Sequence, residues 1–230
     1  MLKIYGVPIS VHTRKVIVAA LHKGLSFEVL PVVPVIPDKL PPNWRVLSPT
    51  GKIPVIQHDD FTLADSTAIC GYLDRAYPDK PIYPAGDART YARALWWEQY
   101  SGSVFSNVVH PLFFEAFVNP NINRIPTDKA KVNHVLTNAM PEMFGYLESQ
   151  LGEQVFLVGS APTVPDWHLA SALTTMQYLG FALDAQRFAQ IGRRHTVIHR
   201  PQRQIHLRVR QREVELVLPL RQRIGIRRRD

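Results

Sequence analysis

The sequence predicts an α/β domain followed by an all-α domain. Strand-like and helix-like segments alternate over the first 77 residues, and prolines then cluster in PDKPIYP, residues 78–84, as is typical of a linker. Beyond this linker the apolar residues recur at helical spacing, and no strand-like run precedes the C-terminal tail. We therefore expect an α/β domain over residues 1–78, a linker over 79–86, an all-α domain over 87–190 and an atypical tail over 191–230.

The first half predicts its elements one by one. Residues 2–5, LKIY, form a short apolar strand, and SVHTRKVIVAALHKGL follows as a helix that Gly24 ends. SFEVLPVV is a second strand, and residues 34–49, which are dotted with proline, are expected to be irregular. VIQHDDFTLA reads as a hairpin of two short strands, and DSTAICGYLDRAY as a helix with Asp65 or Ser66 at its N-cap.

The second half predicts helices only. DARTYARALWWEQYSGSVFSNVVHPLFFEAF is long and helical in pattern, and TDKAKVNHVLTNAMPEMFGYLESQL is a helix interrupted or kinked near Pro141. In TVPDWHLASALTTMQYLGF, Thr163 and Asp166 have the spacing of a capping box, with Asp in place of the usual Glu. DAQRFAQIGRRH is a shorter helix.

Composition limits the class of protein. The chain of 230 residues has one cysteine, Cys70, so an intrachain disulfide is impossible and a reducing cytoplasm is the expected location. No apolar run reaches the ~18 residues that a membrane span needs. The N-terminus lacks a charged region followed by a long apolar run, so we expect no signal peptide.

The positive charge belongs to the tail. Twelve of the 27 basic residues, all of them Arg, and three of the 19 acidic residues follow residue 190, so the rest of the chain is nearly neutral. The tail could be a basic arm for RNA, DNA or acidic lipid, or an altered C-terminus such as one read in a shifted frame. The joint loss of Lys and aromatic residues favours the second reading. A nucleic-acid partner of the main fold is therefore not expected, despite the net charge of +8.

Pro54 and the pair Asp65–Ser66 each allow two interpretations. Pro54 is either a trans proline that begins a strand, or a cis proline that leaves the backbone of Ile53 free to pair with an extended ligand. Asp65–Ser66 is either an ordinary N-cap or a site for an amino-acid zwitterion, with Ser66 and the helix N-terminus on the carboxylate and Asp65 on the ammonium.

Ser10 lies where the first strand turns into the first helix. It is either a plain N-cap or a hydroxyl that donates to a thiolate, which the positive end of the helix would also stabilise. Thr13 and His12 compete for the second role.

Three stretches together resemble a bacterial, cytosolic, serine-type glutathione S-transferase over roughly residues 1–190: GVPISVHTRKVIVAALHKGL, LSPTGKIPVIQHDDFTLADSTAICGYLDRAYP and FLVGSAPTVPDWHLAS. The resemblance implies a thioredoxin-like β-α-β-β-β-α domain followed by a helical-bundle domain. It implies a detoxifying transferase with glutathione as co-substrate, no metal, and a homodimer with no membrane association. The alternative is a related module that has kept the fold for binding or assembly, without catalysis.

The resemblance also implies the site residues. Ser10 stabilises the glutathione thiolate, and no cysteine lies in that region, which argues against disulfide exchange as the main activity. The glutathione peptide then lies against six residues: Lys39, Lys52, Ile53, Pro54, Asp65 and Ser66. Lys52 matches by position as a partner of the glycine carboxylate, and Lys39 is a looser candidate. Cys70, inside the helix after Ser66, is expected to be a small buried residue.

The second substrate is expected in an apolar cleft against the helical domain. Its candidate lining residues are Val11, Tyr100, Phe105, His110 and Phe114. An aryl halide, an epoxide, a peroxide and a conjugated carbonyl all remain open as electrophiles.

Overall fold

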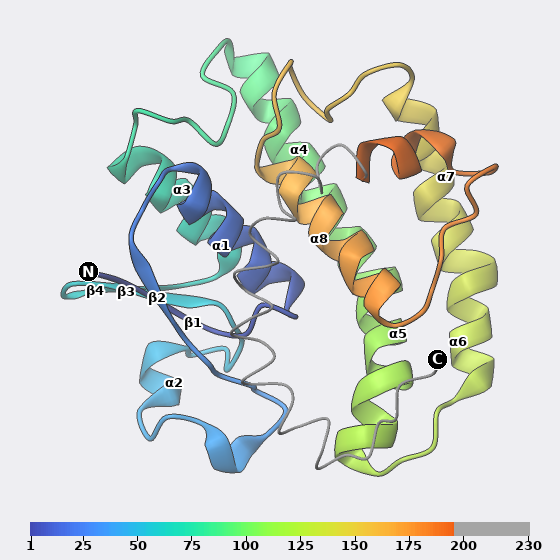
Figure 1. Ribbon diagram of the computed structural model, residues 1–230, viewed down its shortest axis with the longest axis horizontal. Helices are drawn as coiled ribbons and strands as arrows, with labels where there is room; N and C mark the ends of the chain where they lie inside the picture. Colours follow the sequence, from blue (N-terminus) through green and yellow to red (C-terminus); the bar gives the residue numbers. More distant parts are fainter. Residues whose placement is uncertain (196–230) are drawn as a thin grey trace.

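The computed structural model of the protein describes residues 1–195 (Figure 1). Residues 196–230 lie outside the described residues, so both readings of the Arg-rich tail stay predictions. Helical residues run from 189 to 195, where the described chain ends, within the stretch predicted as a shorter helix.

The predicted α/β domain is present, with each strand and helix near its expected place. A four-stranded sheet in the order β2-β1-β3-β4 forms its centre, and Figure 1 shows α1 and α3 on one face and α2 on the other. β1 pairs parallel with β2, whereas β3 pairs antiparallel with both β1 and β4. The element bounds are β1 Leu2–Tyr5, α1 Val11–His22, β2 Phe27–Leu30, α2 Trp44–Leu47, β3 Val55–His58, β4 Phe61–Ala64 and α3 Ser66–Ala76.

The proline-dotted segment is more regular than expected. It holds a 3-10 turn, η1, at Pro37–Lys39 and the one-turn helix α2, whose Trp44 is buried with Val32 and Val55 in a small core of its own. A single helical turn has no apolar periodicity to read, which is why the sequence did not predict it.

The helical domain follows the linker, and no strand occurs among described residues 88–195. Its first predicted helix is one continuous path of α4 and α5 with the π-helical segments η2 and η3, and its second is α6, η4 and α7. At the predicted interruption near Pro141 the helix changes type: η4 ends directly before Met140 and Pro141 stands in the first turn of α7, while the backbone of Ala139 and Met140 stays helical. The bounds are α4 Ala88–Val104, η2 Phe105–Val109, α5 His110–Phe113, η3 Phe114–Asn123, α6 Lys129–His134, η4 Val135–Ala139, α7 Met140–Leu151 and α8 Val164–Tyr178.

Helix α8 is the central helix of the molecule and begins with the predicted capping box. Thr163 and Asp166 make the reciprocal cap, and Asp166 Oδ1 also accepts from the Leu157 N–H at 2.8 Å. Burial raises the pKa of the Asp166 carboxyl from 3.8 to about 6. α8 packs against both α1 and α4, so it joins the two domains.

A buried ion pair also joins the domains. Lys15 of α1 lies 2.6 Å from Glu98 of α4, and both side chains are fully buried. Thr67 of α3 donates to the same carboxylate oxygen at 2.9 Å, and the Tyr83 hydroxyl donates to the other at 2.6 Å. Glu98 therefore ties α1 and the first turn of α3 to the helical domain.

Among the described helices, none has the length and apolarity that a membrane crossing would require.

Candidate functional site

The strand register brings three distant segments to one edge of the sheet. Tyr5, the last residue of β1, is paired with Leu30 on one side and with Val55 on the other, and Val55 is paired with Ala64. Pro54 directly precedes Val55 of this row, Asp65 directly follows Ala64, and Ser10 comes shortly after Tyr5. The turn before α1, the proline before β3 and the start of α3 are therefore neighbours, as the sequence interpretation requires.

Ser10 is the N-cap of α1. Its Oγ accepts from the Thr13 N–H at 3.3 Å, and its own N–H donates to the Val7 carbonyl at 3.0 Å. The side chain is half-buried, and the bond from Thr13 uses the oxygen without using the hydroxyl proton. The arrangement places a potential donor at the positive end of α1, which favours a negatively charged ligand atom.

The two competitors of Ser10 point elsewhere. The Thr13 hydroxyl is completely buried against Gly6, where a Cβ would stand 2.5 Å from Thr13 Oγ1. Gly6 has φ +154°, so neither its backbone nor its surroundings accept a larger residue there. The His12 ring turns to α3, with Nδ1 3.3 Å from Ser66 Oγ.

Asp65 is the N-cap of α3, which settles the alternative between Asp65 and Ser66. Its Oδ1 accepts from the N–H groups of Thr67 at 2.9 Å and Ala68 at 3.1 Å. The residue has φ +80°, a sparsely populated region for a residue with a side chain, and such backbone concentrates at ligand sites. Asp65 is exposed, whereas Ser66 is buried.

The Ile53–Pro54 peptide bond is cis, which confirms that part of the prediction. Pro54 is buried, and Ile53 is half-buried. Lys52 and Lys39 are both exposed, Lys52 next to Ile53 and Lys39 in the η1 turn. The Lys52 carbonyl accepts from the Ser48 hydroxyl at 2.7 Å, so the backbone is held here while the Lys52 side chain remains at the surface.

His12 and three predicted electrophile-side residues form a continuous row of rings. His12 is 4.5 Å from Phe105 between ring centroids, Phe105 is 5.6 Å from His110, and His110 is 4.5 Å from Phe114. Burial, and next the charge of Lys15, lowers the pKa of His12 from 6.5 to about 4, so this ring is neutral at pH 7. The row, which we call the ring row, runs from beside Ser66 along η2 and α5 to η3.

The other two electrophile-side candidates lie outside the ring row. Val11 is buried in the main core. The Tyr100 hydroxyl donates to the Met143 carbonyl at 2.9 Å, and its ring lies against Trp96 and Tyr146, on the side of α4 that faces α7.

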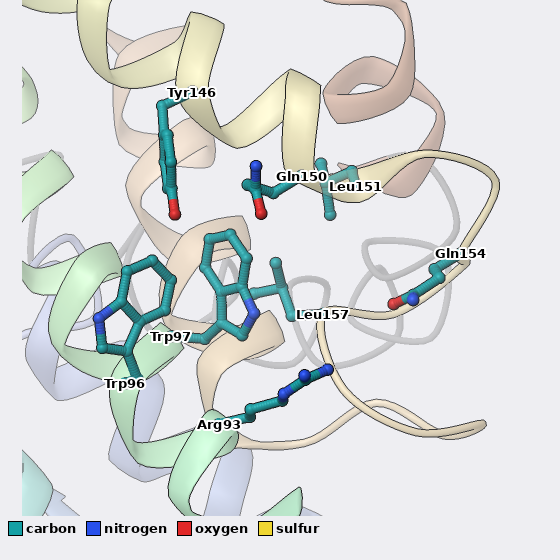
Figure 2. A pocket seen from close by; sticks show the side chains of 8 residues that line it. All are labelled: Arg93, Trp96, Trp97, Tyr146, Gln150, Leu151, Gln154 and Leu157. Atoms are coloured by element: carbon teal, nitrogen blue, oxygen red, sulfur yellow. The ribbon is translucent and has the colours of Figure 1, made fainter.

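That side of α4 has a cavity of its own, of about 340 Å³ (Figure 2). Trp96, Trp97 and Tyr146 supply aromatic walls, and none of the residues at the sheet edge contributes to it. The complete lining is Arg93, Trp96, Trp97, Tyr146, Gln150, Leu151, Gln154 and Leu157.

The described residues contain no group of three or more His, Cys, Asp or Glu side chains that could hold a metal ion. Cys70 is fully buried, as expected, and burial raises the pKa of its thiol to about 12. Cys70 is therefore protonated at neutral pH and is a poor nucleophile.

Two features of the site had only a weak signal in the sequence. His12 was noted only as a competitor of Ser10, yet its ring lies between Ser66 and the ring row. Arg14 was not singled out, although its buried guanidinium contacts the turn that leads to Ser10. A polar residue in an apolar helix pattern is the only hint that the sequence contains for either of them.

Comparison with known families finds one family that matches both domains. Residues 4–81 match the family model described as glutathione S-transferase, N-terminal domain, and residues 113–199 match glutathione S-transferase, C-terminal domain. A glutathione S-transferase of Hyoscyamus muticus is 27% identical over 173 residues, 75% of this chain and 81% of that protein. Glutathione S-transferase 3 of Zea mays is 27% identical over 176 residues, 76% of this chain and 78% of its own length.

Solved structures show the same fold. A crystal structure of a glutathione S-transferase from Rhodospirillum rubrum has a TM-score of 0.77 at 23% identity and covers 87% of this chain and 88% of that one. A glutathione S-transferase-I solved with lactoylglutathione has a TM-score of 0.75 at 20% identity, covering 86% of this chain and 94% of that one.

Proposed function

Because the chain belongs to the glutathione S-transferase family, we propose that it binds glutathione at this sheet edge and that Ser10 stabilises the thiolate for attack on a small electrophile. The observation that carries the proposal is the row Tyr5, Val55, Ala64, which brings Ser10, the cis Pro54 and Asp65 together.

Each end of the peptide finds a chemical partner in this assignment. The exposed Asp65 carboxylate takes the γ-glutamyl ammonium, and Ser66 with the N-terminus of α3 takes the neighbouring carboxylate. The backbone of Ile53 pairs with the cysteine residue. Lys52 and Lys39 supply positive charge for the glycine carboxylate.

Two local interactions, a hydrogen bond and a helix dipole, would then stabilise the thiolate. A free thiol has a pKa of about 8.5, so only a few per cent is ionised at pH 7. Lowering that pKa by about two units makes the thiolate predominant and corresponds to roughly 2.7 kcal/mol. A hydrogen bond from the Ser10 hydroxyl and the dipole of α1 both act on the sulfur.

The electrophile is proposed to lie along the ring row. Phe105 and Phe114 are partly exposed, and His110 is exposed, so the row offers aromatic surface next to the glutathione site. The sulfur lone pair forms the new bond to an electrophilic carbon, and the displaced electron pair leaves with a departing group or moves onto a conjugated oxygen. A flat apolar electrophile matches this surface best.

The test combines binding and turnover. The wild-type chain is expected to be retained on glutathione-agarose, to be eluted by free glutathione, and to conjugate an aryl halide such as 1-chloro-2,4-dinitrobenzene or another electrophile of the classes named above. Absence of retention would refute the proposal.

The second candidate is a glutathione-transferase-like module without catalysis. One relative, Elongation factor 1-gamma 2 of Oryza sativa, is 26% identical over 169 residues that make up only 38% of that protein, so the fold also occurs as part of a longer chain with another name. Retention on glutathione-agarose without turnover of any electrophile class, and with a bound thiol pKa that stays above 8, would favour this candidate.

A homodimer is also proposed, with the α/β half of one chain against the helical half of the other. Apolar side chains at the surface of both halves support it: Trp96 of α4 is 46% exposed, Tyr146 of α7 is 42% exposed and Phe61 of β4 is 42% exposed. Light scattering after gel filtration is expected to give twice the 26.2 kDa chain mass. Trp96→Glu is expected to yield monomer, whereas Ile125→Glu, at an exposed apolar residue outside α4, α7 and β4, is not.

A further inference from the structure

Arg14 is buried one turn into α1, four residues after Ser10. Only 5% of its surface is exposed, and its guanidinium donates in two directions. Toward the turn before Ser10, Nε donates to the Pro8 carbonyl at 3.0 Å and one terminal nitrogen donates to the Ile9 carbonyl at 3.3 Å. Toward α8, the other terminal nitrogen donates to the Ser171 carbonyl at 2.7 Å and to Thr175 Oγ1 at 3.4 Å.

The same guanidinium thus holds the two residues that precede Ser10 and the central helix of the other domain. Thr175 adds a bond of its own, from its hydroxyl to the Ile9 carbonyl at 3.4 Å. The guanidinium carbon also lies 5.7 Å from the centre of the Tyr178 ring, near the end of α8. A planar group with five donors can serve both directions at once, which the single ammonium of a lysine cannot do with the same geometry.

We propose that Arg14 is a positioning residue, which fixes the turn from Val7 to Ser10 against α8 and thereby sets where the Ser10 hydroxyl lies relative to the ring row. The proposal rests on the proposed role of Ser10. It goes beyond that role because it makes the placement of the hydroxyl depend on a contact with the helical domain. Without Arg14, the α/β domain would still hold glutathione through Ile53, Asp65 and Ser66. The Ser10 hydroxyl, however, would be less firmly positioned toward the thiolate.

The experiment compares Arg14→Lys with Arg194→Lys. Arg194 is an equally buried arginine, also 5% exposed, and its guanidinium donates to the carbonyls of Leu151, Gly152 and Gln190 at 2.9–3.1 Å, within the helical domain. The two variants therefore remove the same kind of contact at matched burial, one beside Ser10 and one between segments of the helical domain.

Arg14→Lys is expected to lower kcat by about tenfold, the size of one lost hydrogen bond to a charged group. The KM for glutathione should stay within about twofold, because the peptide contacts lie on other segments. The pKa of the bound thiol, followed by thiolate absorbance, should rise by about one unit, which is a tenfold decrease in the acid ionisation constant of the thiol. Arg194→Lys should leave kcat and thiol pKa at the wild-type values even where it lowers Tm equally. Equal kinetics and equal thiol pKa in the two variants would overturn the proposal.

Hydrogen exchange separates this inference from the proposed function. In Arg14→Lys the amides of residues 6–11 should exchange faster, while those of residues 65–69 stay unchanged, and Arg194→Lys should change neither. This measurement needs no substrate, so it tests the anchoring even if the wild-type chain fails to bind glutathione and the proposed function falls. If Arg14→Lys does not fold, Thr175→Val replaces it, because that variant removes the hydroxyl that contacts both Arg14 and the Ile9 carbonyl. Unchanged exchange over residues 6–11 in a folded variant would refute the anchoring.

Discussion

Helices α1 and α3 begin beside each other at one edge of the sheet, and their first residues are built differently. Ser10 has an ordinary backbone, φ −68°, and its neutral oxygen accepts one N–H from α1. Asp65 has φ +80°, and its carboxylate oxygen accepts two N–H groups from α3. The cap of α1 is uncharged, whereas the cap of α3 carries a full negative charge.

The difference indicates which charge each helix start is suited to receive. The positive end of α1 is not neutralised by its cap, so it can stabilise an anionic sulfur next to the Ser10 hydroxyl. The positive end of α3 already faces the Asp65 carboxylate, so this end can take an ammonium on Asp65 together with a carboxylate at Ser66. A thiolate at one end and a zwitterionic γ-glutamyl group at the other match this division of charge.

The largest expected effect is on stability and comes from removing Glu98, which contacts both α1 and α3. Glu98→Ala leaves Lys15 buried without its carboxylate and also removes the acceptor of the Thr67 hydroxyl. Breaking a buried pair from one side costs about 3–5 kcal/mol, so we expect a loss of that size in the free energy of unfolding measured in urea. The double variant Lys15→Met with Glu98→Met should recover most of it, because no charge is left unpaired. A cost below about 1 kcal/mol for Glu98→Ala, the usual size for an exposed pair, would contradict a role of this pair in holding the helices.

The next effect concerns His12, which bridges the two helix starts. The unfolded ring has an ordinary pKa of 6.5 and the folded ring one of about 4, so the unfolded state binds more protons between these values. Stability is therefore expected to fall as the pH drops from 6.5 to 4, by about 3 kcal/mol from this group. The buried His168, whose pKa is also lowered by burial, acts in the same direction.

His12→Asn isolates that contribution. Urea unfolding at pH 7 and pH 4 should show a smaller acid-induced loss in this variant than in the wild type, by up to about 3 kcal/mol. His134→Asn, at an exposed histidine of α6, is the control and should leave the pH dependence as it is. The same acid-induced loss in all three proteins would show that His12 is not held in its neutral form by the fold.

At the α1 end, Ser10→Ala is expected to act on the chemical step. Loss of a hydrogen bond to a charged atom is worth about 1.5–3 kcal/mol, so kcat should fall roughly 10- to 100-fold while the KM for glutathione changes little. Thr13→Val is a matched control, because the buried Thr13 hydroxyl has no hydrogen-bond partner among residues 1–195 and its removal should leave turnover unchanged. If kcat fell equally in the two variants, the loss would come from disturbing the start of α1 and not from removing the Ser10 hydroxyl.

At the α3 end, Asp65→Asn is expected to act on binding alone. Removing the negative charge should weaken glutathione binding by about tenfold, close to 1.4 kcal/mol, as measured by calorimetry, and leave the bound thiol pKa unchanged. Asp87→Asn is the control, because Asp87 caps α4 through two N–H bonds of the same lengths, 2.9 and 3.1 Å, outside the proposed site. A shift of the thiol pKa in Asp65→Asn would contradict the assignment of the thiolate to the start of α1 and of the γ-glutamyl group to the start of α3.

The predictions from sequence held best where one local rule was sufficient. The strand LKIY, the hairpin after Pro54 and the α8 capping box were predicted from pattern, turn residues and spacing, and each is present. Helix α2 was missed because a single turn has no period. Asp65 as a cap and the cis bond before Pro54 were each one of two local alternatives, and the structure selects between them.

The sequence by itself determined the order of the elements and the candidate residues at the sheet edge, because periodicity, caps and turns are encoded within a few neighbouring residues. Only the tertiary structure decided which groups the buried charged side chains meet. Lys15 meets the Glu98 carboxylate across 83 positions, and Arg14 meets the backbone carbonyl of Ser171 across 157 positions. Neighbouring residues do not indicate these two distant partners, because the cost of burying each charge is offset in part by groups that only the packing of the two domains brings into contact.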